Sequence, residues 1–118
     1  MTFEAFEAYC LSLPAATLSV QWGDDHVYKV GGKMFAVAGP LGGGGAGGYT
    51  FKASDMAFEL LVEQGIARPA PYLARAKWVQ LLERDSLPDH DLMAYLDQAH
   101  ALVSAKLTRT TRAELGLA

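Results

Sequence analysis

Hydrophobic residues recur with two different periods along the first half of the chain. Apolar side chains recur at helical spacing from residue 2 to residue 12, which predicts an amphipathic helix that ends before Pro14. Between residues 17 and 22, apolar and polar positions alternate, which predicts a half-buried strand. The helical stripe consists of Phe3, Phe6, Cys10 and Leu13, and the strand presents Leu18, Val20 and Trp22. Further strands are predicted over residues 26–30, 33–38 and 49–52.

The second and third of these strands are joined by Gly31-Gly32, the strongest turn signal in the chain. A two-residue turn of the primed type needs positive φ at both central residues, which glycine adopts without strain. Counting outward from this turn pairs Val30 with Lys33 and Tyr28 with Phe35. Both faces of the hairpin are then partly apolar, so we expect one to be core and the other to be covered or to serve as a contact surface. The predicted core face carries Tyr28, Val30, Lys33, Phe35 and Val37, and the second face carries Val27, Lys29, Met34 and Ala36.

The second half of the chain reads as helix, strand and helix. Ser54 is the expected N-cap of a helix over residues 55–64, and Gly65 follows its end. The proline-rich run at 68–72 is expected to lack regular structure, and a strand is expected over 77–82. The longest helix is predicted over 88–107, with a buried stripe of Leu92, Leu96, Ala99, Val103 and Leu107. Thr111 and Glu114 match a capping box for a short final helix.

These elements predict an α+β domain with the order α-β-β-β-β-α-β-α. Short turns between consecutive strands favour an antiparallel sheet of about five strands in two layers, with helices packed on one face. One domain is expected over residues 1–118, with a flexible glycine-rich loop at 39–48. We expect a monomer, and the glycines and proline between Met34 and Phe51 exclude a membrane-spanning helix there.

Composition and charge bear on the expected cellular location and on nucleic-acid binding. The chain has 118 residues, a net charge of −3 and a single cysteine, Cys10, on an apolar helix stripe. We therefore expect a buried structural thiol and a cytoplasmic location. The net charge argues against bulk electrostatic binding of nucleic acid, but residues 1–64 have a balance of −4 and residues 65–118 a balance of +1.

Motifs for cofactor or metal chemistry are weak. Gly42, Gly44 and Gly47 match a dinucleotide-binding spacing, but a strand rather than a helix follows them. His90 and His100 are about 80° apart around one helix, too far for a shared metal. We expect no enzyme activity, no cofactor and no metal; a deep pocket lined by His26, Tyr28 and Lys33 would reverse the first expectation.

A basic and aromatic cluster is the most distinctive chemical feature. Its members are Arg68, Tyr72, Arg75, Lys77 and Trp78. Arginines interleaved with aromatic rings suit phosphate contact combined with base stacking. The alternative is a solvated loop whose arginines lie along aromatic faces.

Five segments together resemble the MmcQ/YjbR-like proteins, over nearly the whole chain. They are Val30-Gly31-Gly32-Lys33-Met34-Phe35, Phe51-Lys52, Lys77-Trp78, Ser86-Leu87-Pro88-Asp89 and Ala105-Lys106-Leu107. The resemblance implies a twisted antiparallel sheet, frataxin-like (CyaY-like) or secretion-chaperone-like, and DNA binding through a double-wing arrangement. Among its positions, Lys33, Lys52, Lys77 and Trp78 have chemistry to offer. The chain departs from the family at residues 39–48, where an ordinary turn is replaced by glycines.

Two functions follow as hypotheses. The first is nucleic-acid (DNA) binding, with phosphate contacts from the basic residues and stacking by Trp78 or Tyr72. The second is a protein-interaction or adaptor module that uses the exposed face of the sheet. The basic residues of the first hypothesis are Lys33, Lys52, Arg68, Arg75 and Lys77.

Overall fold

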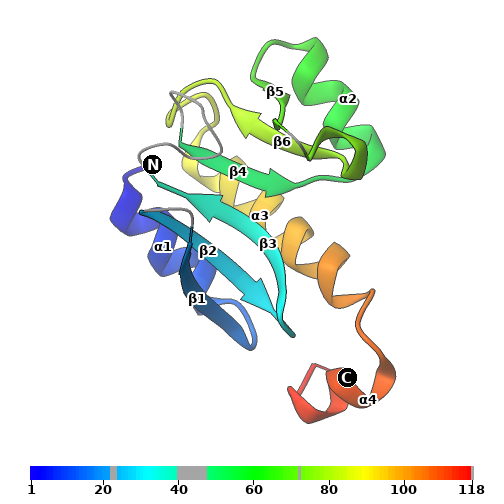
Figure 1. The fold of residues 1–118 in the computed structure, drawn as a ribbon. Coiled ribbons are helices and arrows are strands. Elements are labelled where there is room, and N and C mark those ends of the chain that lie inside the picture. The colour runs from blue at the N-terminus through cyan, green and yellow to red at the C-terminus, as the bar shows by residue number, and fades with distance from the viewer. Residues whose placement is uncertain (22–23, 40–47, 72, 118) are drawn as a thin grey trace.

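An open antiparallel sheet of six strands organises the described part of the chain (Figure 1). The computed structural model describes residues 1–21, 24–39, 48–71 and 73–117. The strands lie in the order β1-β2-β3-β4-β6-β5, and every neighbouring pair is antiparallel. Their bounds are β1 Ala16–Gln21, β2 Asp25–Val30, β3 Lys33–Ala38, β4 Tyr49–Lys52, β5 Ala67–Pro69 and β6 Trp78–Leu81.

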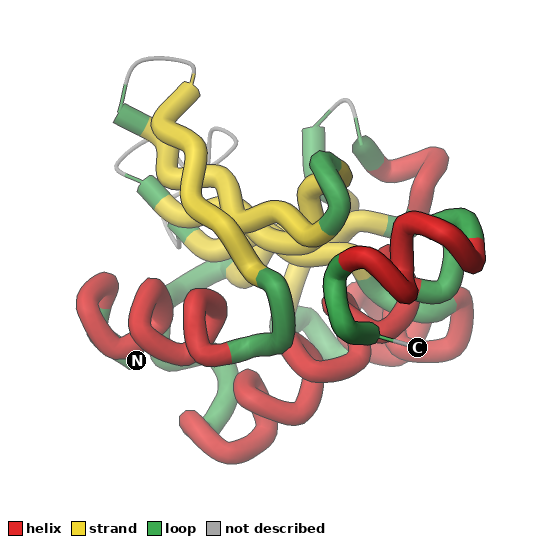
Figure 2. Tube along the Cα trace, turned by 90° about the horizontal axis from the view of Figure 1, so that it is seen from below, coloured by secondary structure: helices red, strands yellow, loops and turns green. Residues whose placement is uncertain are grey.

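Helices pack against one face of this sheet, so the predicted two-layer α+β architecture is confirmed (Figure 2). Helices α1 and α3 contact the central strands, and α2 packs beside β5 and β6. A single 3₁₀ turn, η1, precedes β6. The bounds are α1 Phe3–Ser12, α2 Asp55–Glu63, η1 Ala74–Ala76, α3 Asp89–Ser104 and α4 Arg109–Glu114.

Side-chain caps explain where three of the helices begin. The hydroxyl of Thr2 accepts from the N–H of Ala5, and Ser54, as predicted, caps α2 through the N–H of Ala57. The predicted cap at Thr111 is wrong, because Thr108 accepts the Thr111 N–H and starts the last helix one turn earlier.

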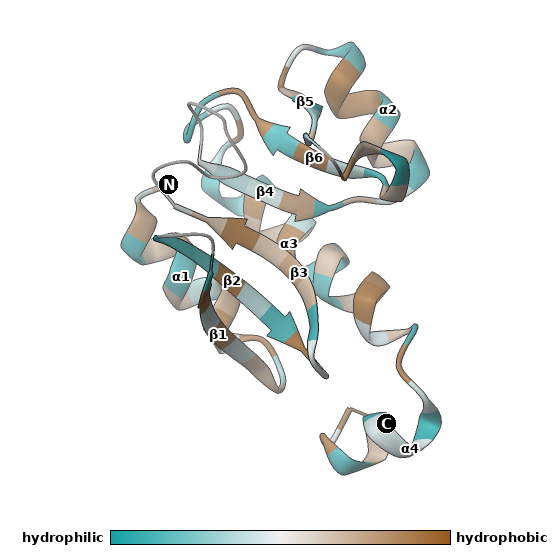
Figure 3. Cartoon of the chain, in the orientation of Figure 1, coloured by the Kyte–Doolittle hydropathy of each residue, from teal (hydrophilic) through white to brown (hydrophobic). Residues whose placement is uncertain are grey.

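The main core lies between the sheet and helices α1 and α3. Phe6 stacks on Tyr49 with ring centroids 4.2 Å apart, and Tyr49 in turn lies on β4. The predicted apolar stripe of the long helix is confirmed as buried. Figure 3 shows the central strand β3 as mostly hydrophobic, with a hydrophilic start at the hairpin tip.

The hairpin turn is as predicted, but the register beyond it shifts by one residue. Gly31 and Gly32 both have positive φ, and Lys29 pairs with Met34. A β-bulge then leaves Phe35 as the extra residue, so that Tyr28 faces Ala36 instead of Phe35. The prediction placed Val37 on the core face and Ala36 on the second face. The bulge exchanges them, because Phe35 and the residue after it both enter the main core.

The second face of the hairpin is covered within the chain. Val27 and Val37 pack there with Ala70 and Trp78 in a smaller apolar cluster. Ala70 lies in the segment between β5 and β6, which includes η1, and Trp78 is the first residue of β6. Because this face is buried, the surface expected for an adaptor function is not exposed at Val27 or Ala36.

Residues 68–72 were predicted to lack regular structure, and that is wrong for the first two of them. Arg68 pairs with Gln80, and Pro69 pairs with Val79, which makes β5 the sixth strand. Proline is compatible with an edge strand because one side of the strand needs no N–H donors.

At the opposite edge, β1 is less buried than its alternating pattern predicts. Leu18 is 40% exposed and Val20 is 56% exposed, on the outermost strand at this end of the sheet order. Trp22, the third apolar residue of the pattern, lies outside the described residues.

The N–H of Gly39 donates to the carbonyl of Gly48 at 3.2 Å, which joins β3 and β4 where the glycine-rich segment leaves and re-enters the sheet. Residues 40–47, on which the prediction of a flexible loop rests, lie outside the described residues.

The two turn glycines should differ in how well they tolerate alanine. Both substitutions place a side chain at positive φ, which costs about 1 kcal/mol. A Cβ at Gly31 would also lie 2.6 Å from Cδ1 of Leu107, whereas a Cβ at Gly32 meets nothing within 4 Å. We expect Gly31→Ala to lower the free energy of unfolding by about 2 to 3 kcal/mol and Gly32→Ala by about 1 kcal/mol, measured by urea denaturation.

The double variant Gly31→Ala/Leu107→Ala provides the control. Its loss should be smaller than the sum of the two single losses, because the shorter side chain removes the clash. Equal losses for the two glycine variants would contradict this account of the turn.

Candidate nucleic-acid interface

Lysines gather at the end of the sheet that carries the hairpin tip. Lys33 begins β3, Lys52 ends β4 and Lys77 immediately precedes β6. Because neighbouring strands are antiparallel, the start of β3, the end of β4 and the start of β6 meet at one end of the sheet (Figure 1). The C-terminal end of α3 reaches the same place, since Leu107 lies against Gly31. Lys106 therefore joins the group. We call Lys33, Lys52, Lys77 and Lys106 the cationic end.

Lys52 is at the centre of this group. Its Nζ donates to the carbonyl oxygen of Ala76, which attaches the end of β4 to η1. Partial burial, together with the positive charges of Lys106 and Lys77, lowers the pKa of Lys52, while Asp55 opposes the shift. Lys106 and Lys77 therefore both lie within electrostatic range of Lys52.

Lys77 occupies an unusual backbone position. Its φ of 65° lies in the left-handed region, where a residue with a Cβ is strained. The strain is held by two backbone hydrogen bonds, from the Lys77 N–H to Ala74 and from the Ala53 N–H to the Lys77 carbonyl. Nζ lies 4.9 Å from the ring centroid of Phe58, a cation–π contact. Glycine would adopt this backbone conformation without strain, whereas the lysine at this position is strained.

Lys33 and Arg75 are exposed at the border of the cationic end. Lys33 pairs with Val30 as predicted, and its side chain is exposed at the hairpin tip. Arg75 is exposed on η1, next to the carbonyl that Lys52 contacts. Within the described ranges, no ion pair involves any residue of the cationic end or Arg75.

Arg68 and Trp78, which were also predicted for the interface, make contacts elsewhere. The Nε of Arg68 donates to Oε1 of Gln80 at 2.7 Å, across the β5–β6 pair. Trp78 is only 4% exposed and packs in the cluster on the second face, so its ring offers no platform for a base. Tyr72 lies outside the described residues. Lys106 was missed as a site residue, although the family-like segment Ala105-Lys106-Leu107 contains it.

Carboxylates are concentrated at the other end of the sheet. The turn before β2, the first half of α1 and the segment between β6 and the first turn of α3 all lie there (Figure 1). Their acidic residues are Glu4, Glu7, Asp24, Asp25, Glu83, Asp85, Asp89 and Asp91. The net charge of −3 therefore conceals two ends of opposite sign.

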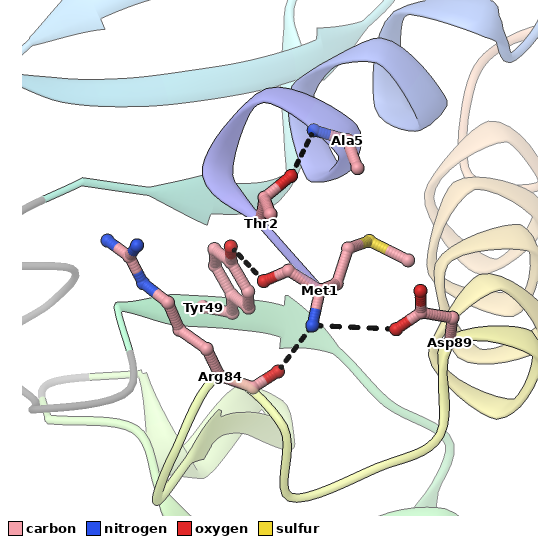
Figure 4. A network of polar contacts seen from close by, with 6 residues as sticks. All are labelled: Met1, Thr2, Ala5, Tyr49, Arg84 and Asp89. Atoms are coloured by element: carbon pink, nitrogen blue, oxygen red, sulfur yellow. Dashed lines mark hydrogen bonds and ion pairs between the residues drawn. The ribbon is translucent and has the colours of Figure 1, made fainter.

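This acidic end holds a polar network around Met1 (Figure 4). The backbone nitrogen of Met1 donates to the carbonyl of Arg84 and lies 3.4 Å from Oδ1 of Asp89, while Tyr49 donates to the Met1 carbonyl. A cleft nearby includes His26, but not the Tyr28 and Lys33 that sequence reasoning grouped with it. Tyr28 is buried, and Lys33 lies at the far end of the sheet.

A metal site and a membrane-spanning helix are both absent from the described residues. No group of three or more His, Cys, Asp or Glu side chains in this part of the chain is arranged to hold a metal ion. No helix among the same residues is both long and apolar enough to cross a membrane.

The fold and its charge distribution define a small α+β domain built on an open antiparallel sheet. The sequence model of the YjbR family matches residues 11–102, and the chain therefore belongs to this family. The crystal structure of Deinococcus radiodurans protein DR2400, a DUF419 domain, is similar with a TM-score of 0.81 and 23% identity. The match covers 99% of this chain and 89% of that one, and shows a shared fold. No curated protein matches the chain.

Two substitutions at residue 77 test the strained backbone. Alanine keeps the left-handed strain, whereas glycine removes it, and both remove the charge and the contact with Phe58. We expect Lys77→Gly to be more stable than Lys77→Ala by about 0.5 to 1 kcal/mol in urea denaturation. The reverse order, which is usual where backbone is helical or extended, would show that residue 77 does not hold this conformation.

Cys10 should be chemically silent in the folded protein. The thiol is fully buried, and burial, reinforced by the negative charge of Glu7, raises its pKa. We expect a chromogenic disulfide reagent to react roughly 100-fold more slowly with the native protein than with the protein unfolded in urea. Comparable rates would mean that α1 opens readily from the sheet.

Proposed function

We propose that this protein binds the phosphate backbone of duplex DNA through the cationic end. The observation that carries the proposal is the convergence of Lys52, Lys77 and Lys106 from separate segments, with Lys33 at the same end of the sheet. None of these lysines forms an ion pair with a described carboxylate. Placing ammonium groups close together is unfavourable unless an anion shares the site. A polyanion with regularly spaced charges is the partner that this arrangement suits best.

The chemistry of the cationic end favours backbone contact over base reading. Lysine ammonium groups act as point charges, whereas sequence reading relies on planar groups such as Arg or Asn placed at base edges. Of the two aromatic residues expected to stack on bases, Trp78 is buried and Tyr72 lies outside the described residues. We therefore expect binding that depends little on sequence and that prefers duplex to single strands.

The acidic end would help to orient the protein as it approaches DNA. An electric dipole along the sheet turns the lysines toward a polyanion and the carboxylates away from it. Overall net charge consequently matters less than the local field at the approaching surface. Arg75, exposed beside Lys52 and Lys77, would supply a further contact at the rim.

Fluorescence anisotropy with a short labelled DNA duplex tests the proposal. We expect a dissociation constant of about 10⁻⁴ to 10⁻⁶ M at low to moderate salt. Lys33→Gln/Lys106→Gln removes two exposed charges without touching the core, and should reduce the slope of log affinity against log salt by about 1.8.

Arg84→Gln is the matched control, because it removes one exposed positive charge at the acidic end. Its affinity for the duplex should equal that of the parent protein. The proposal is wrong if the parent protein binds more weakly than about 10⁻⁴ M at low salt, or if Arg84→Gln loses as much affinity as the lysine double variant.

A further inference from the structure

A cleft at the acidic end brings together charges of both signs. It has a volume of about 490 Å³ and is lined by Phe3, Glu4, Asp24, His26 and Arg84. This volume is in the range of small-molecule sites. A second hollow of about 680 Å³ shares Phe3, Glu4 and Arg84 with it, so the two open onto a common rim.

The imidazole of His26 is held in a fixed orientation. Its Nδ1 lies 2.6 Å from Oε1 of Glu7, and the same oxygen accepts from the Tyr28 hydroxyl at 3.2 Å. The ring of Phe3 meets the imidazole edge-on at 5.0 Å. With Nδ1 bonded to the carboxylate, Nε2 is the ring nitrogen left for a ligand. Nε2 makes no hydrogen bond to any residue that the structure describes.

Arg84 supplies the positive charge of the cleft. Its side chain extends beside the ring of Tyr49, with the guanidinium carbon 5.5 Å from the ring centroid (Figure 4). Although the acidic end is rich in carboxylates, Arg84 forms no ion pair in the described part of the chain. A guanidinium fixed along an aromatic ring keeps its fork of N–H donors available for a carboxylate.

The lining selects one class of ligand. A simple anion that reached Arg84 would be repelled by Glu4 and Asp24, and a simple cation would be repelled by Arg84. A zwitterion satisfies both requirements, with its carboxylate at Arg84 and its ammonium group at Glu4 or Asp24. Phe3 offers an apolar wall for a side chain. We propose that the cleft beside α1 binds a small zwitterion of the α-amino-acid type, with an apolar side chain, and that Nε2 of His26 hydrogen-bonds to the ligand.

Glu7 is a positioning residue in this site. It does not line the cleft, but its carboxylate holds Nδ1 of His26 and thereby orients Nε2. The same contact also attaches α1 to β2, which a purely structural pair would do as well. The proposal therefore needs a readout of ligand binding and not of stability alone.

Amide NMR spectra recorded during titration with L-leucine provide that readout. We expect shifts at Phe3, Asp24, His26 and Arg84, and none at the cationic end. Two analogues test the zwitterion requirement, 4-methylpentanoate, which lacks the amine, and 3-methylbutylamine, which lacks the carboxylate. Each should bind at least about tenfold more weakly than L-leucine, since one charged partner in the cleft is left without its ligand group.

Variants locate the site and separate it from the proposed DNA interface. Arg84→Gln and His26→Gln should each weaken L-leucine binding by about tenfold or more, with a native amide spectrum confirming that the variant is folded. Lys33→Gln, at the other end of the sheet, should bind L-leucine as the parent protein does. The inference is overturned by an absence of shifts with L-leucine, by equal binding of either analogue, or by unchanged binding in Arg84→Gln. Binding to DNA would stand or fall independently of these results.

Discussion

The central hairpin must be buried on both of its faces, and much of the structure follows from this requirement. One face of β2 and β3 packs on α1 and α3, as in any two-layer α+β domain. The other face carries Val27 and Val37, which would expose apolar surface if left open. Ala70, in the segment between β5 and β6, and Trp78, at the start of β6, cover them. Burying the second face thus takes Trp78 out of reach of any ligand and brings η1 over the end of β4.

The same covering segment builds the cationic end. Once η1 lies over the end of β4, the carbonyl of Ala76 meets Nζ of Lys52. The chain then has to turn sharply back into β6, and it does so through the left-handed backbone of Lys77. Apolar burial on the second face therefore has an electrostatic consequence at its border, since it holds Lys77 within range of Lys52. The segment between β5 and β6 therefore determines both the apolar packing on the second face and the position of Lys77.

The two ends of the sheet have different chemistry. Four lysines without an ion pair to a described carboxylate lie at the hairpin end, the end proposed to contact a polyanion. The other end has an open cleft with an oriented imidazole, a guanidinium and carboxylates, which suits a small molecule with separated charges. Family membership is shown by the match over residues 11–102, and the structural similarity to DR2400 concerns the fold. Both proposed functions follow from the residues at the two ends of the sheet, and not from the structural similarity to DR2400.

Local signals in the sequence determined most of the elements. Gly31-Gly32 specifies its turn because only glycine adopts both φ angles freely, and Ser54 begins its helix because a hydroxyl can accept the Ala57 N–H. The apolar stripe of α3 could also be predicted from the sequence, because the helical period is a local property.

Only the tertiary structure decided the rest, because it depends on contacts between distant residues. The bulge at Phe35 follows from packing in the core, the strand at Arg68 from the free edge of β6, and the exposure of Lys33 from its place at the end of the sheet. In the sequence, basic residues interleaved with aromatic residues pointed to Trp78. The convergence of Lys52, Lys77 and Lys106, and the pairing of Glu7 with His26, required the chain to be folded.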